Sequence, residues 1–158
     1  MNVNRNILVG VLLSFGLATS HADASVSKGD AIEFVRQYQQ ALQSHDAGTL
    51  NYLVAEDARI RIELDQHEGE RQHFTLTAQR FVQQIRALWH FADNQQLAFS
   101  APEYHRDANG AMIVILQQED RRLLFGQPTG QRDRLTITLD RQGGQVRIVE
   151  LHSVSRLW

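Results

Sequence analysis

Two segments of the chain carry apolar residues at the spacing of one helix face. They run from 30 to 44 and from 78 to 92, with apolar side chains three and four positions apart. The two stripes consist of Ile32, Val35, Tyr38 and Leu42, and of Phe81, Ile85, Leu88 and Trp89. A single stripe on a polar helix predicts packing against one surface. Asp30 with Glu33 indicates a capping box for the first helix, and a short helix is predicted at 45–55 with Asp46 as its N-cap.

The remaining segments alternate apolar and polar residues, which is the pattern of half-buried strands. In 59–64, Ile60, Ile62 and Leu64 share one face and charged residues share the other. Further strands are predicted at 73–77, 96–106, 111–120, 132–140 and 145–158, with hairpin turns at Asn109-Gly110 and Gly143-Gly144. Two helices, two strands, one helix and about four antiparallel strands predict an α+β fold with the helices on one face of the sheet.

Two stretches resemble the NTF2-like superfamily, which includes nuclear transport factor 2, ketosteroid isomerases, scytalone dehydratase and the SnoaL-like polyketide cyclases. They are AIEFVRQYQQALQSHDAGTLNYLVAEDARI (31–60) and GGQVRIVELHSV (143–154). The resemblance implies a cone-shaped α+β fold, with a curved antiparallel sheet and about three helices on its concave side. It also implies an apolar pocket between sheet and helices, and a homodimer formed through the outer face of the sheet.

The resemblance to the ketosteroid isomerases can be followed residue by residue. Their oxyanion-hole tyrosine falls on Tyr38, but the position of their general-base aspartate holds Ile62. Their second oxyanion donor maps approximately to Leu135, beside Thr136. An isoleucine cannot abstract a proton, which requires a carboxylate, an imidazole or a similar group. The comparison therefore argues against ketosteroid isomerase activity.

The last predicted strand contains the candidate catalytic residues, Glu150 and His152. In a regular strand they share a face with Ile148, so a carboxylate and an imidazole would lie side by side in the pocket. The alternative pattern turns Val149 and Leu151 inward and leaves both polar residues in solvent. A single β-bulge switches between the two arrangements.

Six residues are predicted to line a pocket for a small apolar ligand: Tyr38, Ile62, Phe81, Ile85, Trp89 and Leu135. Three functions fit these patterns. The first is binding of a small molecule or a protein partner. The second is a SnoaL-like isomerase, cyclase or dehydratase that uses Glu150 and His152, with Tyr38 as hydrogen-bond donor. The third is an assembly module of an envelope complex.

Two charged segments are interpreted as solvated surface. Glu56 and Asp57 fall where a helix gives way to a strand, and acidic side chains at such corners are usually exposed. The segment EDRRLLFGQPTGQRDR (119–134) holds four arginines among acids. It is predicted to form an exposed hairpin, with an anion-binding rim as the alternative.

The first 24 residues have the layout of a secretory signal peptide, with a basic start, a 12-residue apolar run and Ala22-Asp23-Ala24 before the expected cleavage site. The apolar run is shorter than the roughly 17–25 residues of a membrane-spanning helix. We therefore expect cleavage after Ala24, a periplasmic or secreted protein without a stable membrane anchor, and one domain at 25–158.

The composition narrows the chemistry further. The chain has no cysteine, which excludes disulfides, a thiolate nucleophile and cysteine metal ligands. A net charge of −2 argues against binding to nucleic acid. The histidines lack the spacing of a zinc site, and there is no glycine-rich phosphate-binding motif. We expect neither a metal nor a cofactor.

Overall fold

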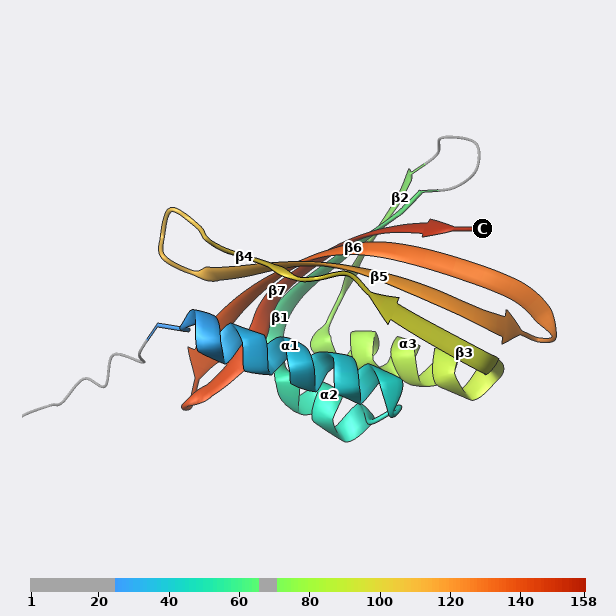
Figure 1. Ribbon diagram of the computed structural model, residues 1–158, viewed down its shortest axis with the longest axis horizontal. Helices are drawn as coiled ribbons and strands as arrows, with labels where there is room; N and C mark the ends of the chain where they lie inside the picture. The colour runs from blue at the N-terminus through green and yellow to red at the C-terminus, as the bar shows by residue number, and fades with distance from the viewer. Residues whose placement is uncertain (1–24, 66–70) are drawn as a thin grey trace, which may run out of the picture.

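The structure, a computed structural model, describes residues 25–65 and 71–158. Within them, three helices pack on one face of a seven-stranded sheet (Figure 1). The helices are α1 (Lys28–Gln43), α2 (Ala47–Leu53) and α3 (Ala78–Phe91). The strands are β1 (Val54–Asp65), β2 (Arg71–Leu76), β3 (Ala92–Phe99), β4 (Glu103–Arg106), β5 (Met112–Leu124), β6 (Gln127–Gln142) and β7 (Gln145–Leu157). The predicted α+β fold is confirmed.

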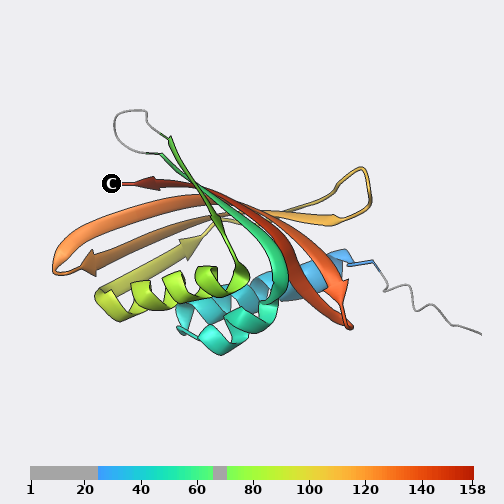
Figure 2. The ribbon, with the colours of Figure 1, turned by 180° about the vertical axis from the view of Figure 1, so that it is seen from behind.

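The order of strands in the sheet is β2-β1-β7-β6-β5-β3, with β4 paired to β5. The last strand, β7, therefore lies inside the sheet, parallel to β1 and antiparallel to β6. Figures 1 and 2 show from opposite sides how the sheet curves over the helices. The concave face between them holds the apolar core.

Helix α1 begins before the predicted capping box. Its N-cap is Ser27, whose hydroxyl accepts from the Asp30 backbone N–H while the Asp30 carboxylate accepts from the Ser27 N–H. Glu33 instead pairs with Arg36 one turn later. The prediction of Ile32 in the buried stripe is wrong, because it is 50% exposed. The buried face of α1 consists of Ala31, Phe34, Val35, Tyr38, Ala41 and Leu42.

Two long hairpins turn through pairs of residues with positive φ. Phe125 and Gly126 (φ 53° and 78°) join β5 to β6, and Gly143 and Gly144 (φ 56° and 79°) join β6 to β7. This is the conformation of the type I′ turn, whose twist matches that of antiparallel strands. The first hairpin is paired along its whole length. Segment 119–134 is therefore not an exposed hairpin throughout, since one of its faces lies on the concave side.

A β-bulge at Val149 decides which side chains of β7 face the core. The pairing with β6 shifts between Ile148 and Glu150, which leaves Val149 without a cross-strand partner. Ile148 and Leu151 are consequently both on the concave face, where they are 0% and 1% exposed. In a regular strand, residues three apart would point to opposite faces.

No helix in the described ranges is long and apolar enough to cross a membrane. The predicted signal peptide, residues 1–24, lies outside the described residues.

Candidate functional site

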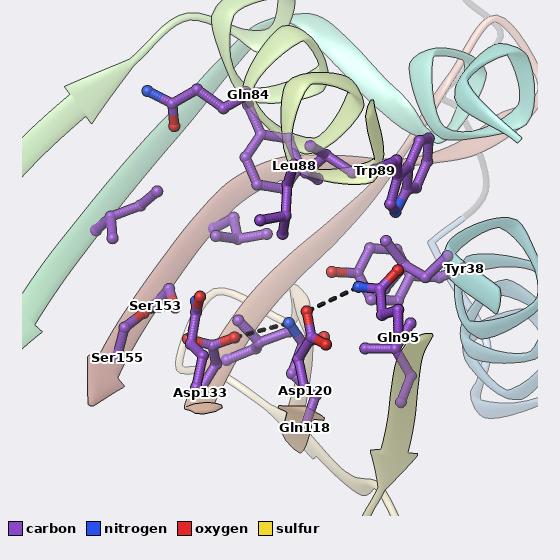
Figure 3. A pocket seen from close by; sticks show the side chains of 18 of the residues that line it. Tyr38, Gln84, Leu88, Trp89, Gln95, Gln118, Asp120, Asp133, Ser153 and Ser155 are labelled. Carbon is purple, nitrogen blue, oxygen red and sulfur yellow. Dashed lines mark hydrogen bonds between the residues drawn. The ribbon is translucent and has the colours of Figure 1, made fainter. Parts of the chain in front are cut away.

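A partly open cavity of about 250 Å³ lies between the curved sheet, α3 and the end of α1. Figure 3 shows side chains of α3, among them Leu88, facing polar side chains of the sheet across it. Tyr38 enters from the side of α1 (Figure 3). The cavity therefore has a mostly apolar side on α3, apart from Gln84, and a sheet side where polar side chains lie beside leucines of β3, β6 and β7.

All six residues predicted to line a pocket do line this cavity: Tyr38, Ile62, Phe81, Ile85, Trp89 and Leu135. Leu88, Leu97 and Leu151 add further apolar surface. Ile62, at the position of the isomerase base, thus contributes a hydrocarbon side chain where that enzyme has a carboxylate. The role of the six residues in ligand binding stays a prediction.

One wall of the cavity is a buried ion pair between Asp120 and Arg122 of β5. Their side chains are only 6% and 5% exposed. The Asp120 carboxylate also accepts a hydrogen bond of 2.7 Å from the Gln95 amide of β3. On the far side, His45 Nε2 lies 2.8 Å from the Gln95 carbonyl oxygen. The amide of Gln95 is therefore fixed at both ends and holds Asp120 in one orientation.

A second buried carboxylate, Asp133 of β6, continues this wall. The Gln118 and Gln131 amides donate to its two oxygens, each at 2.8 Å (Figure 3 shows the Gln118 bond). Arg122 in turn donates to the Gln131 carbonyl oxygen at 3.0 Å. The two carboxylates thus belong to one hydrogen-bonded network, and bonds to ionised groups of this kind are among the stronger ones in proteins.

The Tyr38 hydroxyl points into the middle of the cavity (Figure 3). The side chain is 2% exposed, and the hydroxyl has no hydrogen-bond partner among the described residues. Burial raises the pKa of Tyr38 far above its usual range, and the negative charge of Asp133 raises it further. The hydroxyl therefore stays protonated at physiological pH and is free to donate to, or accept from, a bound molecule.

Replacing Tyr38 by phenylalanine is expected to leave the melting temperature unchanged or to raise it slightly. The hydroxyl that is removed has no partner among residues 25–65 and 71–158, and burying an unpaired polar group is unfavourable. Calorimetry of the variant measures the change, with Tyr52→Phe at the exposed Tyr52 as the matched control. A drop well beyond that of the control would show that the hydroxyl does support the fold.

Glu150 and His152 do not line the cavity. The bulge in β7 turns both to the outer face of the sheet, and Leu151, Ser153 and Ser155 line the cavity in their place. The prediction of a regular strand with Glu150 and His152 facing the pocket is wrong. The structure has the alternative arrangement, in which Leu151 faces inward. The proposed pair of pocket acid and imidazole is therefore not formed.

Both residues instead join ion pairs on the outer face. Glu150 accepts from Arg61 at 2.5 Å and from Arg59 at 3.3 Å. His152 Nε2 lies 2.9 Å from the Glu63 carboxylate. Because these groups are partly exposed, the pairs contribute little individually to stability.

Replacing Glu63 by glutamine is expected to destabilise the protein near neutral pH but not in acid. The His152 hydrogen bond, aided by nearby positive charge, lowers the pKa of Glu63 from its ordinary 4.5. Stabilisation from a lowered carboxyl pKa is present above the unfolded-state pKa and is lost as the pH falls through the folded-state pKa. Urea unfolding at about pH 7 and about pH 3 measures it. The exposed Glu56→Gln is the control, and an equal loss at both pH values would contradict the prediction.

The polar wall is the part of the site that the sequence interpretation missed. Continuing the two-residue period of the buried Met112, Val114 and Leu116 leads along β5 to Gln118, Asp120 and Arg122. The same alternation therefore places Asp120 and Arg122 on the inward face. The sequence nevertheless predicts a strand only to 120, because charged side chains are rarely buried unless they are paired. Arg122 pairs with Asp120 of the same strand, but Gln95 and Gln131, which complete the network, come from β3 and β6, and alternation within β5 does not identify them.

The four arginines of 119–134 are divided between the two faces of the sheet. Arg132 and Arg134 line an open hollow together with Arg156, so an anion-binding rim there stays a prediction. Arg121 and Arg132 lie on the outer face, where both donate to Glu119 at 2.7 Å. Arg122 points inward. Glu56 and Asp57 are exposed, as predicted. In the part of the chain that the structure describes, no cluster of His, Asp and Glu could hold a metal ion.

A scan against protein-family models and a search of curated proteins both found no match. Solved structures do match. An NTF2-like protein of unknown function in nutrient uptake from Rhodospirillum rubrum has a TM-score of 0.59 and 18% identity, covering 79% of this chain and 97% of that one. A putative scytalone dehydratase from Novosphingobium aromaticivorans has a TM-score of 0.62 and 11% identity, covering 79% and 80%. ActVI-ORFA from Streptomyces coelicolor has a TM-score of 0.56 and 14% identity, covering 79% and 93%.

These neighbours differ in their described functions, and at such low identity they establish the architecture and not an activity. The strand order, the three helices on the concave face and these structural neighbours agree with the resemblance seen in the sequence. The chain adopts the NTF2-like fold.

Proposed function

We propose that this protein binds a small organic molecule in the cavity between α3 and the sheet. The apolar part of the ligand packs against Ile62, Ile85 and Trp89, and its polar part meets the wall formed by the two buried carboxylates. The observation that carries the proposal is the Tyr38 hydroxyl, which belongs to a buried side chain, points into the cavity and has no hydrogen-bond partner among the described residues. Native proteins seldom leave such a group unpaired.

Binding fits the site better than isomerisation. Ile62 cannot act as a base, and the cavity carboxylates are already engaged, Asp120 by Arg122 and Asp133 by two amides. The geometry therefore supports recognition of a ligand and offers no free acid–base pair for turnover.

Native mass spectrometry of the protein purified from its own cell envelope, and thermal melts with added phenethyl alcohol, test this proposal. We expect a co-purified small molecule, and a rise in melting temperature with the alcohol, since a ligand of the native state stabilises it by mass action. Leu135→Trp, which fills the cavity, is expected to abolish both effects. Thr136→Trp places the same bulk on the neighbouring residue of β6, which is not among the cavity-lining residues, and is expected to retain them.

An apo mass for every preparation, together with no response to the alcohol, would overturn the proposal. So would retention of binding by Leu135→Trp, because the ligand would then sit elsewhere.

We also propose that the chain is exported and processed after Ala24, on the basis of the N-terminal pattern alone. N-terminal sequencing of the protein from a periplasmic or culture fraction is expected to begin at Ser25. A chain that keeps Met1 in the cytoplasmic fraction would exclude export.

The homodimer through the sheet stays a proposal of the same kind. The face concerned carries the ion pairs of Arg61 with Glu150 and of Arg132 with Glu119. Sedimentation equilibrium of the mature chain is expected to give twice its monomer mass, and a monomer at all concentrations would exclude the dimer.

A further inference from the structure

We propose that the ligand is an organic cation, a protonated amine on a compact apolar group, with its ammonium beside the polar side chains on the sheet side of the cavity. The inference rests on the proposed function and names the chemical class that the same cavity selects. It follows from the charges of the wall, from the polar atoms that the network leaves unpaired, and from the size of the cavity.

The charge of the cavity wall is negative. Its lining residues include two carboxylates, Asp120 and Asp133, one guanidinium, Arg122, and the neutral Tyr38. The guanidinium is engaged by Asp120, so the charge of Asp133 is balanced by amide dipoles and not by a counter-ion. A cation placed beside it gains Coulomb energy that is larger in a buried site than in water.

The unpaired atoms of the wall are mostly acceptors. The amides of Gln95, Gln118 and Gln131 each donate to a carboxylate. The second Asp120 oxygen and the Gln118 carbonyl oxygen have no partner, while Arg122 Nε is the unpaired donor of this wall. Both oxygens are buried within the wall, and the oxygen of the Tyr38 hydroxyl, which points into the cavity, is a further acceptor. An ammonium brings three donors and no acceptor, which matches this arrangement.

An anionic ligand fits poorly. Asp133 lies close enough to Tyr38 for its charge to raise the pKa of the phenol, in addition to the effect of burial. The same field disfavours any negative group that comes to the hydroxyl, including an oxyanion. Arg122, the cation of the wall, already has its guanidinium bound to Asp120 and Gln131. Only its buried Nε is left without a partner, so the wall offers a carboxylate or a phosphate one donor beside two negative charges.

The volume restricts the apolar part. An apolar cavity of about 150 Å³ accommodates benzene, and this cavity measures about 250 Å³. One aromatic ring with a short aminoalkyl chain fills the space. Its ring packs against Trp89 and Ile85, and its ammonium reaches Tyr38.

Three probes of matched shape test the inference on the wild-type mature chain: phenethylamine, phenethyl alcohol and hydrocinnamate. They carry a cation, a neutral hydroxyl and an anion on the same phenylethyl group. Titration calorimetry at neutral pH is expected to show the amine binding about tenfold more tightly than the alcohol, and no measurable binding of the carboxylate. Trp89 fluorescence in a Trp158→Phe background gives a second readout from inside the cavity.

Two charge-neutralising variants test whether the preference for the amine comes from the cavity wall. Asp133→Asn is expected to reduce the advantage of the amine over the alcohol to about twofold or less, because the unbalanced carboxylate is gone. Asp57→Asn makes the same change at an exposed acid and is expected to preserve the preference. The wild-type series decides the question by itself if Asp133→Asn does not fold.

The outcomes separate the two proposals. If none of the probes binds, the proposed binding function fails. If the alcohol or the carboxylate binds as tightly as the amine, the cavity is a binding site but the inference of a cationic ligand is overturned. If Asp57→Asn loses the preference as Asp133→Asn does, the selectivity does not come from the cavity wall and the inference is likewise overturned.

Discussion

Replacing Arg122 by methionine is expected to lower the free energy of unfolding by about 3–5 kcal/mol. The guanidinium is 5% exposed and binds Asp120 and Gln131. Methionine keeps much of the volume of the side chain but leaves the Asp120 carboxylate buried without its counter-ion. Removing one partner of a buried pair is costly because the other charge stays out of water. Guanidinium chloride unfolding followed by circular dichroism measures the loss.

A double variant distinguishes the loss of the ion pair itself from the cost of leaving the Asp120 carboxylate buried without a counter-ion. Adding Asp120→Leu to Arg122→Met is expected to recover most of the loss, since apolar residues can replace a buried ion pair with little net cost. Arg121→Met changes the next residue of β5, whose side chain is 68% exposed, and is expected to alter stability by no more than about 0.5 kcal/mol. Equal losses at 121 and 122 would contradict the buried position of Arg122.

Replacing Leu151 by alanine is expected to cost about 2–5 kcal/mol, the range for truncating a buried leucine. Leu151 is 1% exposed and packs in the core cluster beside the cavity. Its removal also enlarges the cavity, which adds to the loss of buried apolar surface. Urea unfolding measures the stability, and the linear dependence on denaturant is expected to keep its slope.

The neighbouring substitution His152→Ala is the internal control for the direction of β7. His152 is on the outer face, where it contacts Glu63, so its truncation is expected to cost less than about 1 kcal/mol. A larger effect at 152 than at 151 would show a regular strand with His152 inward. That result would also restore the acid and imidazole to the cavity.

Much of the fold follows from local pattern. The stripe in 78–92 corresponds to α3, and the alternation of Ile60 and Ile62 corresponds to β1. The hairpin turn predicted at Gly143-Gly144 is present. Both residues have a positive φ, which a type I′ turn requires and which glycine adopts without strain. These features are predictable because helix faces, strand alternation and tight turns each depend on residues close together in the sequence.

The apolar lining of the site was predictable for the same reason. Tyr38, Ile62, Phe81 and Leu135 lie on inward faces that their own elements define. The polar wall was not, because its charged members also depend on partners from other strands, such as Gln95 for Asp120 and Gln118 for Asp133. Local pattern assigns an unpaired arginine or aspartate to solvent.

Patterns in the sequence were enough to establish the α+β class, the inward faces of α3 and β1, and most of the inward face of α1, where Ile32 is the exception. The resemblance to the ketosteroid isomerases added that Ile62 falls at the position of their base. The direction of β7 depended on the assembled sheet, in which the bulge at Val149 turns Glu150 and His152 outward and Leu151 inward. The position of the bulge depends on hydrogen bonding to both neighbours of β7, because the register shifts in its pairing with β1 as well as with β6. Residues of β7 alone do not specify it. The same contacts between strands bring Asp120, Arg122 and Asp133 together, and with them the chemistry of the cavity.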